Sequence, residues 1–318
     1  MKKLLILGLL AAGLAYGVAK WQLHSKVSKS MDRVVMMASP FAKIEYEGVR
    51  STFGGELTVE GIQVDFNDFR DPLNIDRVGI DTGGFFALLK ISDFVTLKHD
   101  SIPDYFGFIV ENARVPADAD YFRTAYRFME EASGREIPED PQLTCAGQYG
   151  LSPAMLGDLG YTEQVFSMRT GFRREAAGIL VDFDMRIDDM WDATASLELA
   201  GSFTPGQAMT GGYKPRMSRF RLEYTDRSLN ERIHAHCERN GLTAEQILKA
   251  QIDAFKQYGV DSGIEFDEYV IDPYVEFLQG KDTLVITAEP NEPVALSQID
   301  LYKPSDVPAL LKLEASTY

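Results

Sequence analysis

Alternating hydrophobic and polar residues dominate the middle of the chain. In the run GILVDFDMRID (178–188) every second residue is hydrophobic, and most residues between them are charged. The run 193–199 repeats this alternation, and the segments 166–172 and 220–224 extend it. Alternation with period two sends the two sets of side chains to opposite faces of a strand. The pattern therefore predicts antiparallel strands with one hydrophobic and one charged face. The segment DDMWD (188–192) is predicted to form a hairpin turn.

The first part of the chain predicts further strands. KIEYEGVRSTFGGELTVEGIQVDF (43–66) has the pattern of a β-hairpin with its turn at Gly54-Gly55. Each strand changes phase at a glycine, Gly48 or Gly61, and a bulge at each would keep the hydrophobic side chains on one face. The remaining predicted strands cover 75–82, 104–116 and 283–289.

Helical patterns interrupt the strands in two places. Helical spacing over 117–134, followed by a loop and a short helix at 153–159, predicts a helical insertion near 118–160. A second helical segment near 228–280 has clearer limits. Ser228 with Glu231 and Thr243 with Gln246 form capping-box patterns, and Asp272-Pro273 predicts a third helix start. Glycines end these helices at Gly241, Gly259 and Gly280.

The N-terminus, MKKLLILGLLAAGLAYGVAKWQLHSK, has the pattern of an export signal. Two lysines precede an uncharged stretch from Leu4 to Ala19, and Lys20 and Trp21 are typical of a membrane interface. Three interpretations stay open: an uncleaved signal-anchor, a cleaved signal peptide, and a buried structural helix. Under the first, residues 1–25 form a single transmembrane helix and 26–40 a connector. The lysines then stay in the cytoplasm, and residues 41–318 lie in a bacterial periplasm.

These patterns predict an α+β fold. We expect an N-terminal membrane-anchor helix followed by an extended, curved antiparallel sheet packed with helices. A hydrophobic content of 45% over 318 residues suffices for a genuine core. The net charge of −16, from 48 acidic and 32 basic residues, excludes nucleic-acid binding as the main function.

Motifs for catalysis are absent from the sequence. It has no G-x-S-x-G, H-E-x-x-H, P-loop or G-x-G-x-x-G motif, and only four histidines. We therefore name no catalytic residue, no metal ligand and no cofactor. An enzyme such as a hydrolase remains a third hypothesis without an assigned residue.

The stretch RIHAHCERNG (232–241) concentrates two histidines and one of the two cysteines. On a helix, His234 and His236 point about 200° apart and cannot bind one ion together, so we expect both at the surface. Cys237 follows Ile233 on the hydrophobic stripe, and in an oxidising compartment its natural partner is Cys145. A Cys145–Cys237 disulfide is the preferred interpretation, with two buried thiols or a metal site as the alternatives.

The first third of the chain resembles a known family. The strand pattern Gly-x-Leu-x-Val-x-Gly-Ile at 55–62, the next strand at 75–80 and the apolar ALL at 87–89 follow an N-terminal anchor. This order resembles the opening of AsmA and TamB type envelope proteins, which are bacterial relatives of bridge-like lipid-transfer proteins. The resemblance covers residues 1–115. It implies a protein anchored in the membrane by its N-terminus and a hydrophobic groove. The capped helices and the cysteine pair depart from that pattern.

The leading functional hypothesis is non-catalytic. We expect the protein to bind or hand on a lipid or another hydrophobic envelope component in a groove lined by the apolar strand faces. The groove candidates are Val181, Phe183, Met185, Ile187, Leu197 and Leu199. The alternative for each is an ordinary core residue covered by the C-terminal helices. The alternative function is a membrane-anchored scaffold or adaptor of an envelope complex, with an acidic surface that meets a basic protein partner.

Overall fold

The protein has the predicted α+β fold. A computed structural model describes residues 2–94, 103–121, 123–124, 145, 153–201, 214–264 and 266–318. An N-terminal helix is followed by an antiparallel sheet of 12 strands with accompanying helices. The chain packs as two compact units, residues 1–112 and 113–318, which we call unit 1 and unit 2. The single periplasmic domain, 41–318, that the sequence predicted stays a prediction.

Unit 1 is built around one central strand. Its elements are α1 (Lys2–Ala38), β1 (Ala42–Glu45), β2 (Gly48–Ser51), β3 (Glu56–Phe66), β4 (Leu73–Asp81), α2 (Phe85–Phe94) and the first part of β5 (Tyr105–Pro116). β3 pairs antiparallel with β4 along most of its length. The end of β3 pairs with β1 and its beginning with β2.

The predicted hairpin over 43–66 is confirmed, and glycines shape it. Gly55 at the turn has a φ of 99°, and a Cβ there would lie 2.2 Å from the backbone nitrogen of Gly84. Both the left-handed conformation and the close approach require glycine. The first strand is interrupted between Glu45 and Gly48, and Gly61 on β3 has a φ of 62° near this break. The phase changes thus lie where the two glycines predicted them.

Helix α1 is continuous and packs on β3 and α2 within unit 1. The predicted connector, 26–40, is helical as far as Ala38. Leu23 is buried in a cluster with Leu57 of β3 and Leu88 of α2. Within the residues that the structure describes, no helix combines the length and the apolar character needed to cross a membrane. The membrane-anchor interpretation of residues 1–25 stays a prediction.

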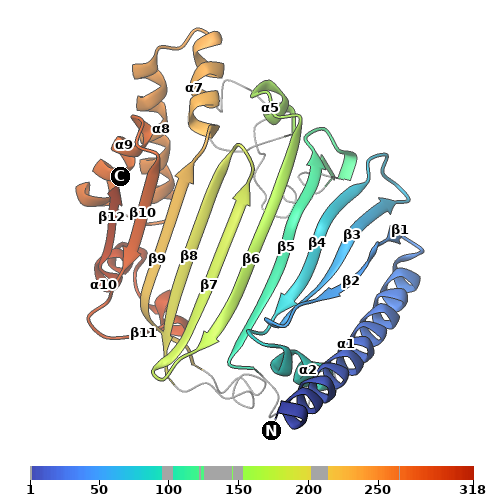
Figure 1. Ribbon diagram of the computed structural model, residues 1–318. Coiled ribbons are helices and arrows are strands. Elements are labelled where there is room, and N and C mark those ends of the chain that lie inside the picture. The colour runs from blue at the N-terminus through green and yellow to red at the C-terminus, as the bar shows by residue number, and fades with distance from the viewer. Residues whose placement is uncertain are drawn as a thin grey trace. The chain divides into compact units, whose positions relative to one another are not determined.

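Unit 2 contains the alternating strands. They are β6 (Glu163–Arg174), β7 (Gly178–Ile187), β8 (Trp191–Ala200), β9 (Arg216–Asp226), β10 (Thr283–Ala288), β11 (Val294–Ala295) and β12 (Leu313–Thr317). Strands β6 to β9 follow one another as antiparallel neighbours, and β10 and β12 continue the sheet (Figure 1). The complete strand order is β1-β3-β4-β5-β6-β7-β8-β9-β10-β12, with β2 on β3 and β11 on β9. The segment 188–190 forms the predicted β7–β8 turn.

The helices of unit 2 follow the strands or connect them. They are α5 (Pro153–Asp158), α7 (Leu229–Arg239), α8 (Ala244–Asp261), α9 (Glu268–Leu278), α10 (Val307–Leu311) and the 3-10 helices η1 (Leu296–Leu301) and η2 (Pro304–Asp306). The predicted capping box at Thr243 and Gln246 is present, with both reciprocal hydrogen bonds. Most of the predicted insertion near 118–160 lies outside the described residues.

One predicted side-chain cap and one predicted helix start are wrong. Ser228 precedes α7 but makes no cap with its side chain, because its hydroxyl donates to the backbone oxygen of Asp189. The carboxylate of Asp226 instead accepts from the backbone N–H of Asn230 at 3.2 Å. Helix α9 begins at Glu268, so Pro273 lies inside it rather than at its start. Buried residues on both sides of the proline, Val270 and Phe277, hold this helix on the core despite the lost hydrogen bond.

Candidate functional site

The six predicted groove residues lie on one face of β7 and β8. Direct cross-strand partners point to the same face of a sheet. The register pairs Ile179 with Leu199, Val181 with Leu197, Phe183 with Ala195, Met185 with Ala193, and Ile187 with Trp191. The structure therefore brings all six candidates together, on a surface that we call the apolar face of unit 2.

The apolar face continues onto the neighbouring strands. Met168 of β6 lies opposite Met185. Leu222 of β9 lies opposite Ala195, and Ile286 of β10 lies opposite Leu222. Hydrophobic side chains from β6 to β10 thus line one surface.

Both ends of the apolar face are covered. At one end, Leu199 is 9% exposed in a cluster that also contacts Val181, Leu197, Leu296 of η1 and Leu311 of α10. At the other end, Ile187 packs against a second cluster, whose members include Leu156 of α5, Cys237 and Ile233 of α7. For Leu199 and its neighbours, and for Ile187, the structure fits the interpretation as core residues.

The middle of the apolar face lies outside both of these clusters. Phe183 and Met185 keep partly exposed side chains and, among the described residues, belong to neither cluster. The same holds for Met168, Leu222 and Ile286. These five residues, the central patch, are where a hydrophobic ligand could contact the sheet. The sequence could not separate Phe183 and Met185 from the other candidates, because all six share the same alternation.

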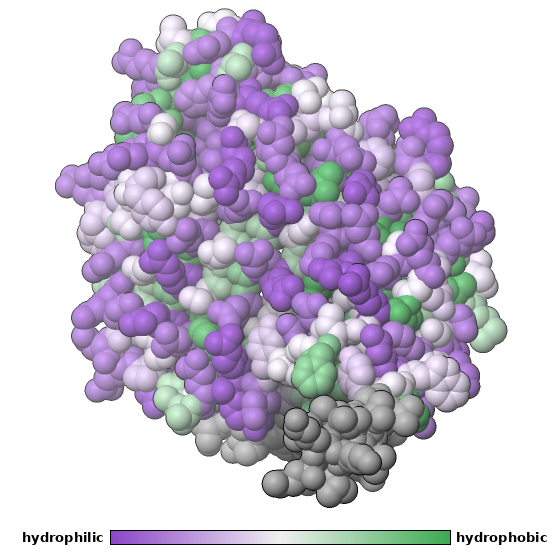
Figure 2. All heavy atoms as spheres, viewed as in Figure 1, coloured by the Kyte–Doolittle hydropathy of each residue, from purple (hydrophilic) through white to green (hydrophobic). Residues whose placement is uncertain are grey.

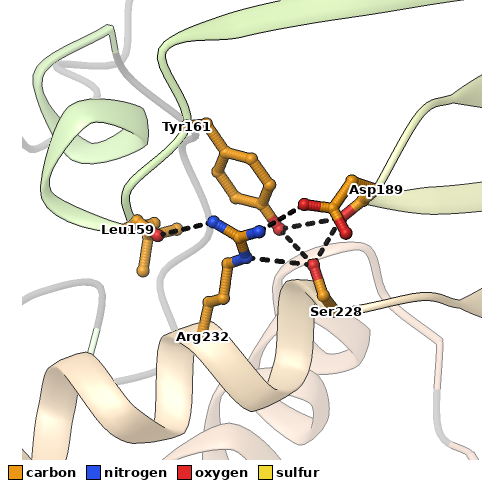
Figure 3. A network of polar contacts seen from close by, with 5 residues as sticks. All are labelled: Leu159, Tyr161, Asp189, Ser228 and Arg232. Carbon is orange, nitrogen blue, oxygen red and sulfur yellow. Dashed lines mark hydrogen bonds and ion pairs between the residues drawn. The ribbon is translucent and has the colours of Figure 1, made fainter.

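A polar network lies beside the covered end near α7 (Figure 3). The Arg232 guanidinium donates to the Asp189 carboxylate, to Ser228 Oγ at 3.1 Å and to the Leu159 carbonyl at 3.3 Å. It also lies 4.2 Å from the centre of the Tyr161 ring, a cation–π distance. The Tyr161 hydroxyl is 3.0 Å from Ser228 Oγ. The network joins the β7–β8 turn and the start of α7 to the segment before β6.

The geometry of this network favours a structural role. Ser228 donates its hydroxyl proton to a backbone carbonyl, so no side-chain base activates it as a nucleophile. Burial raises the pKa of Tyr161, which keeps that hydroxyl protonated at neutral pH. Local sequence patterns contain no sign of this network, because its members are separated by up to 73 residues.

Asp226, at the end of β9, is a half-buried carboxyl group with an altered pKa. Burial raises its pKa from 3.8 to about 6, although the backbone N–H groups of Asn230 and Leu229 act in the opposite direction. Tyr224 on the same strand packs between Trp191 and Phe277, with ring centres 5.8 and 5.7 Å away. Burial raises the pKa of Tyr224 well above its ordinary value. This corner of unit 2 is therefore largely desolvated.

The predicted disulfide is present. Cys145 and Cys237 are bonded across a sequence separation of 92 residues. Their exposed fractions are 2% and 0%, and both belong to the cluster beneath α7. The bond therefore ties residue 145 to a helix that closes one end of the apolar face.

The two histidines of α7 differ from the prediction. His236 is buried, and its Nε2 lies 3.0 Å from Nδ2 of Asn240, so its expected surface position is wrong. Asn240 supplies the polar partner that burial requires. His234 Nε2 lies 3.3 Å from Oε1 of Gln251. Among the residues that the structure describes, no group of three or more potential ligands could hold a metal ion.

Two pockets lie beyond the apolar face. One, of about 740 Å³, is lined by residues that include Arg216, Val294, Tyr302 and Leu310. Arg216 is already engaged there, since Nε and Nη2 donate to the Pro293 carbonyl at 3.0 and 2.7 Å. The other, of about 490 Å³, lies along β12. On the face drawn in Figure 2, hydrophilic residues predominate and hydrophobic residues form small separate groups.

Comparison with known proteins adds a match to the second half of the chain. A family model described as "Uncharacterized protein" matches residues 160–317. No curated protein matches the chain. The matched segment contains strands β6 to β12, and with them the central patch and Tyr161, Asp189, Ser228 and Arg232. Residues 1–115 lie outside the match, so their resemblance to AsmA and TamB type proteins stays a prediction.

Proposed function

We propose that the protein binds a lipid or another hydrophobic envelope component on the central patch of unit 2. The observation that carries this proposal is the uneven packing of the apolar face. Its two ends are packed against helices, whereas Phe183, Met185 and their neighbours are partly exposed and, among the described residues, belong to neither cluster. A face that served only as core would gain stability from the same covering along its whole length.

The side chains of the central patch suit an acyl chain. Methionine side chains are flexible and polarisable, so Met168 and Met185 adapt to ligands of different shape. Each methylene group that leaves water contributes about 0.8 kcal/mol. The five residues of the patch are all hydrophobic, which favours a ligand recognised by its apolar part.

We place the body of the protein in an oxidising compartment, the bacterial periplasm, with the N-terminal helix as the inner-membrane anchor. The Cys145–Cys237 bond supports this location, because disulfides persist in exported proteins and are rare in the cytosol. The Met1–Lys26 pattern supports the anchor, with release after signal cleavage as the alternative.

The second candidate function is an adaptor in an envelope complex. The observation that favours it is the outer sheet edge at β12, which has Glu314 on the strand and Asp267 and Glu268 at the start of α9 near the adjoining pocket. This function does not require the central patch to hold a ligand.

Native mass spectrometry of the detergent-extracted full chain tests the lipid proposal. We expect co-purified lipid on the wild-type protein and a loss of most of it in Met185→Asp, because a charge in the patch opposes an acyl chain. Asp184→Asn is the matched control, since the neighbouring residue points to the other face and is exposed. Lipid-free wild-type protein, or equal lipid in both variants, would contradict the proposal.

A further inference from the structure

Strand β12 is the outer strand of unit 2. It pairs antiparallel with β10, from Leu313 opposite Ala288 to Thr317 opposite Leu284, and the strand order ends there (Figure 1). An outer strand has one row of backbone groups that its own sheet does not use. The register shows which groups these are.

The outward backbone groups belong to every second residue. The backbone N–H of Tyr318 donates to the Thr283 carbonyl at 3.3 Å, so these directly opposed residues form a hydrogen-bonded pair. Such pairs alternate along an antiparallel ladder. Glu314 and Ser316 therefore face β10 with their N–H and C=O groups, and Leu313, Ala315 and Thr317 direct theirs outward. Within the described part of the chain, none of these three outward N–H groups has a backbone partner outside the β10–β12 pairing.

A pocket of about 490 Å³ adjoins this edge. Its lining combines Tyr269 of α9, Ala309 of α10 and the first residues of β12. The Tyr269 side chain is 47% exposed and forms an aromatic wall. A strand added to β12 would place alternate side chains toward this pocket.

The charges around the edge are mainly acidic. Glu314 lines the pocket and is exposed, and Asp267 and Glu268 lie beside Tyr269 in sequence, with Asp267 hydrogen-bonded to its hydroxyl. Lys312 is the basic residue of the pocket lining. A second copy of this chain, with a net charge of −16, would be repelled. A basic segment would be attracted.

We infer that the outer edge of β12 binds an extended, basic segment of a partner protein as an added strand, with one of its side chains in the pocket beside Tyr269. The backbone groups of Leu313, Ala315 and Thr317 supply the main-chain hydrogen bonds, and Glu314 selects lysine or arginine in the partner. The site is the outer edge of the sheet and not the central patch, so this inference can be tested independently of lipid binding.

Synthetic peptides test this inference on the full chain. The probe is a fluorescein-labelled Lys-Val-Lys-Leu-Lys-Val-Lys peptide, with a version that has glutamate in place of lysine and a version with alternate N-methylated amides. Fluorescence anisotropy should give binding that is about tenfold weaker for the glutamate peptide and about fivefold weaker for the N-methylated one. Equal affinity of the lysine and glutamate peptides would overturn the inference.

Variants locate the binding at the edge. Ala315→Pro removes an outward N–H without touching the β10 ladder, and we expect affinity for the lysine peptide to fall about fivefold. Glu314→Gln should weaken the same peptide by about threefold and keep the fold intact, while Glu292→Gln, an exposed acid at the other pocket, should not change it. Unchanged affinity in both edge variants would overturn the inference.

Hydrogen–deuterium exchange gives an independent readout. The segment 313–317 should gain protection when the lysine peptide binds, because the three outward amides acquire partners. Protection confined to other segments would contradict the proposed site. A dimer in sedimentation that Ala315→Pro abolishes would assign the edge to a second copy and would equally overturn the basic-segment inference.

Discussion

Opening the Cys145–Cys237 disulfide is the perturbation with the largest expected effect on unit 2. The bond closes a loop with a sequence separation of 92 residues, and both sulfur-bearing side chains are buried. A double Cys145→Ala/Cys237→Ala variant removes the crosslink and leaves no buried unpaired thiol. Chemical reduction of the wild-type protein removes the crosslink without changing the sequence.

Loop entropy sets the size of the effect. Closing a loop of this length lowers the entropy of the unfolded chain enough to stabilise the folded state by about 4 to 5 kcal/mol. Strain in the native state lowers that value, so we expect a loss of about 3 to 5 kcal/mol in the free energy of unfolding. Most domains have only about 5 to 15 kcal/mol in total, so the variant should be close to the limit of folding.

Urea unfolding followed by fluorescence and circular dichroism measures this change. The reduced wild-type protein and the double-alanine variant should lose similar amounts of stability and show a larger denaturant dependence, since the unfolded chain then exposes more surface. A loss below about 1 kcal/mol in both would refute the reasoning, because the crosslink would then constrain nothing that unfolding releases. A loss in the variant alone would assign the effect to side-chain packing instead.

Two further predictions concern the polar corner of unit 2. The folded-state pKa of Asp226 is raised from 3.8 to about 6, so between these pH values the folded protein binds more protons than the unfolded chain. The free energy of unfolding should therefore fall as the pH rises through this window. In Asp226→Asn, urea unfolding at several pH values should show a weaker dependence of this free energy on pH. Arg232→Ala removes the centre of the polar network and should lower the free energy of unfolding by about 1 to 2 kcal/mol, whereas Arg239→Ala, at the exposed end of the same helix, should stay within about 0.5 kcal/mol. Equal losses in the two arginine variants would show that the network is not a stabilising unit.

Local patterns in the sequence predicted most strands and part of the helix starts. The alternation over 178–199 fixed the antiparallel strands β7 and β8 and the shared face of the six groove candidates, because period two determines the direction of each side chain. The Thr243–Gln246 capping box is also confirmed, because both partners lie within one helical turn and the motif is local.

Long-range contacts decided the rest. Ser228 has the sequence of a helix cap, but the backbone oxygen of Asp189, 39 residues away, accepts its hydroxyl instead. His236 is buried, with Asn240 as its polar partner, although it lies outside the hydrophobic stripe of Ile233 and Cys237. The difference between the covered ends of the apolar face and its central patch depends on η1, α10, α5 and α7, which pack on the face from distant parts of the chain. Alternation in β7 and β8 contains no information on that packing.

Site-specific photo-crosslinking tests lipid binding at the central patch most directly. A photoreactive benzoylphenylalanine in place of Phe183 and, in a separate protein, in place of Asp184 would probe adjacent residues on opposite faces of β7. With phospholipid vesicles that contain a radiolabelled phospholipid, we predict a lipid adduct at position 183 and little or none at position 184. Equal labelling at the two positions, or no labelling at position 183, would contradict the account.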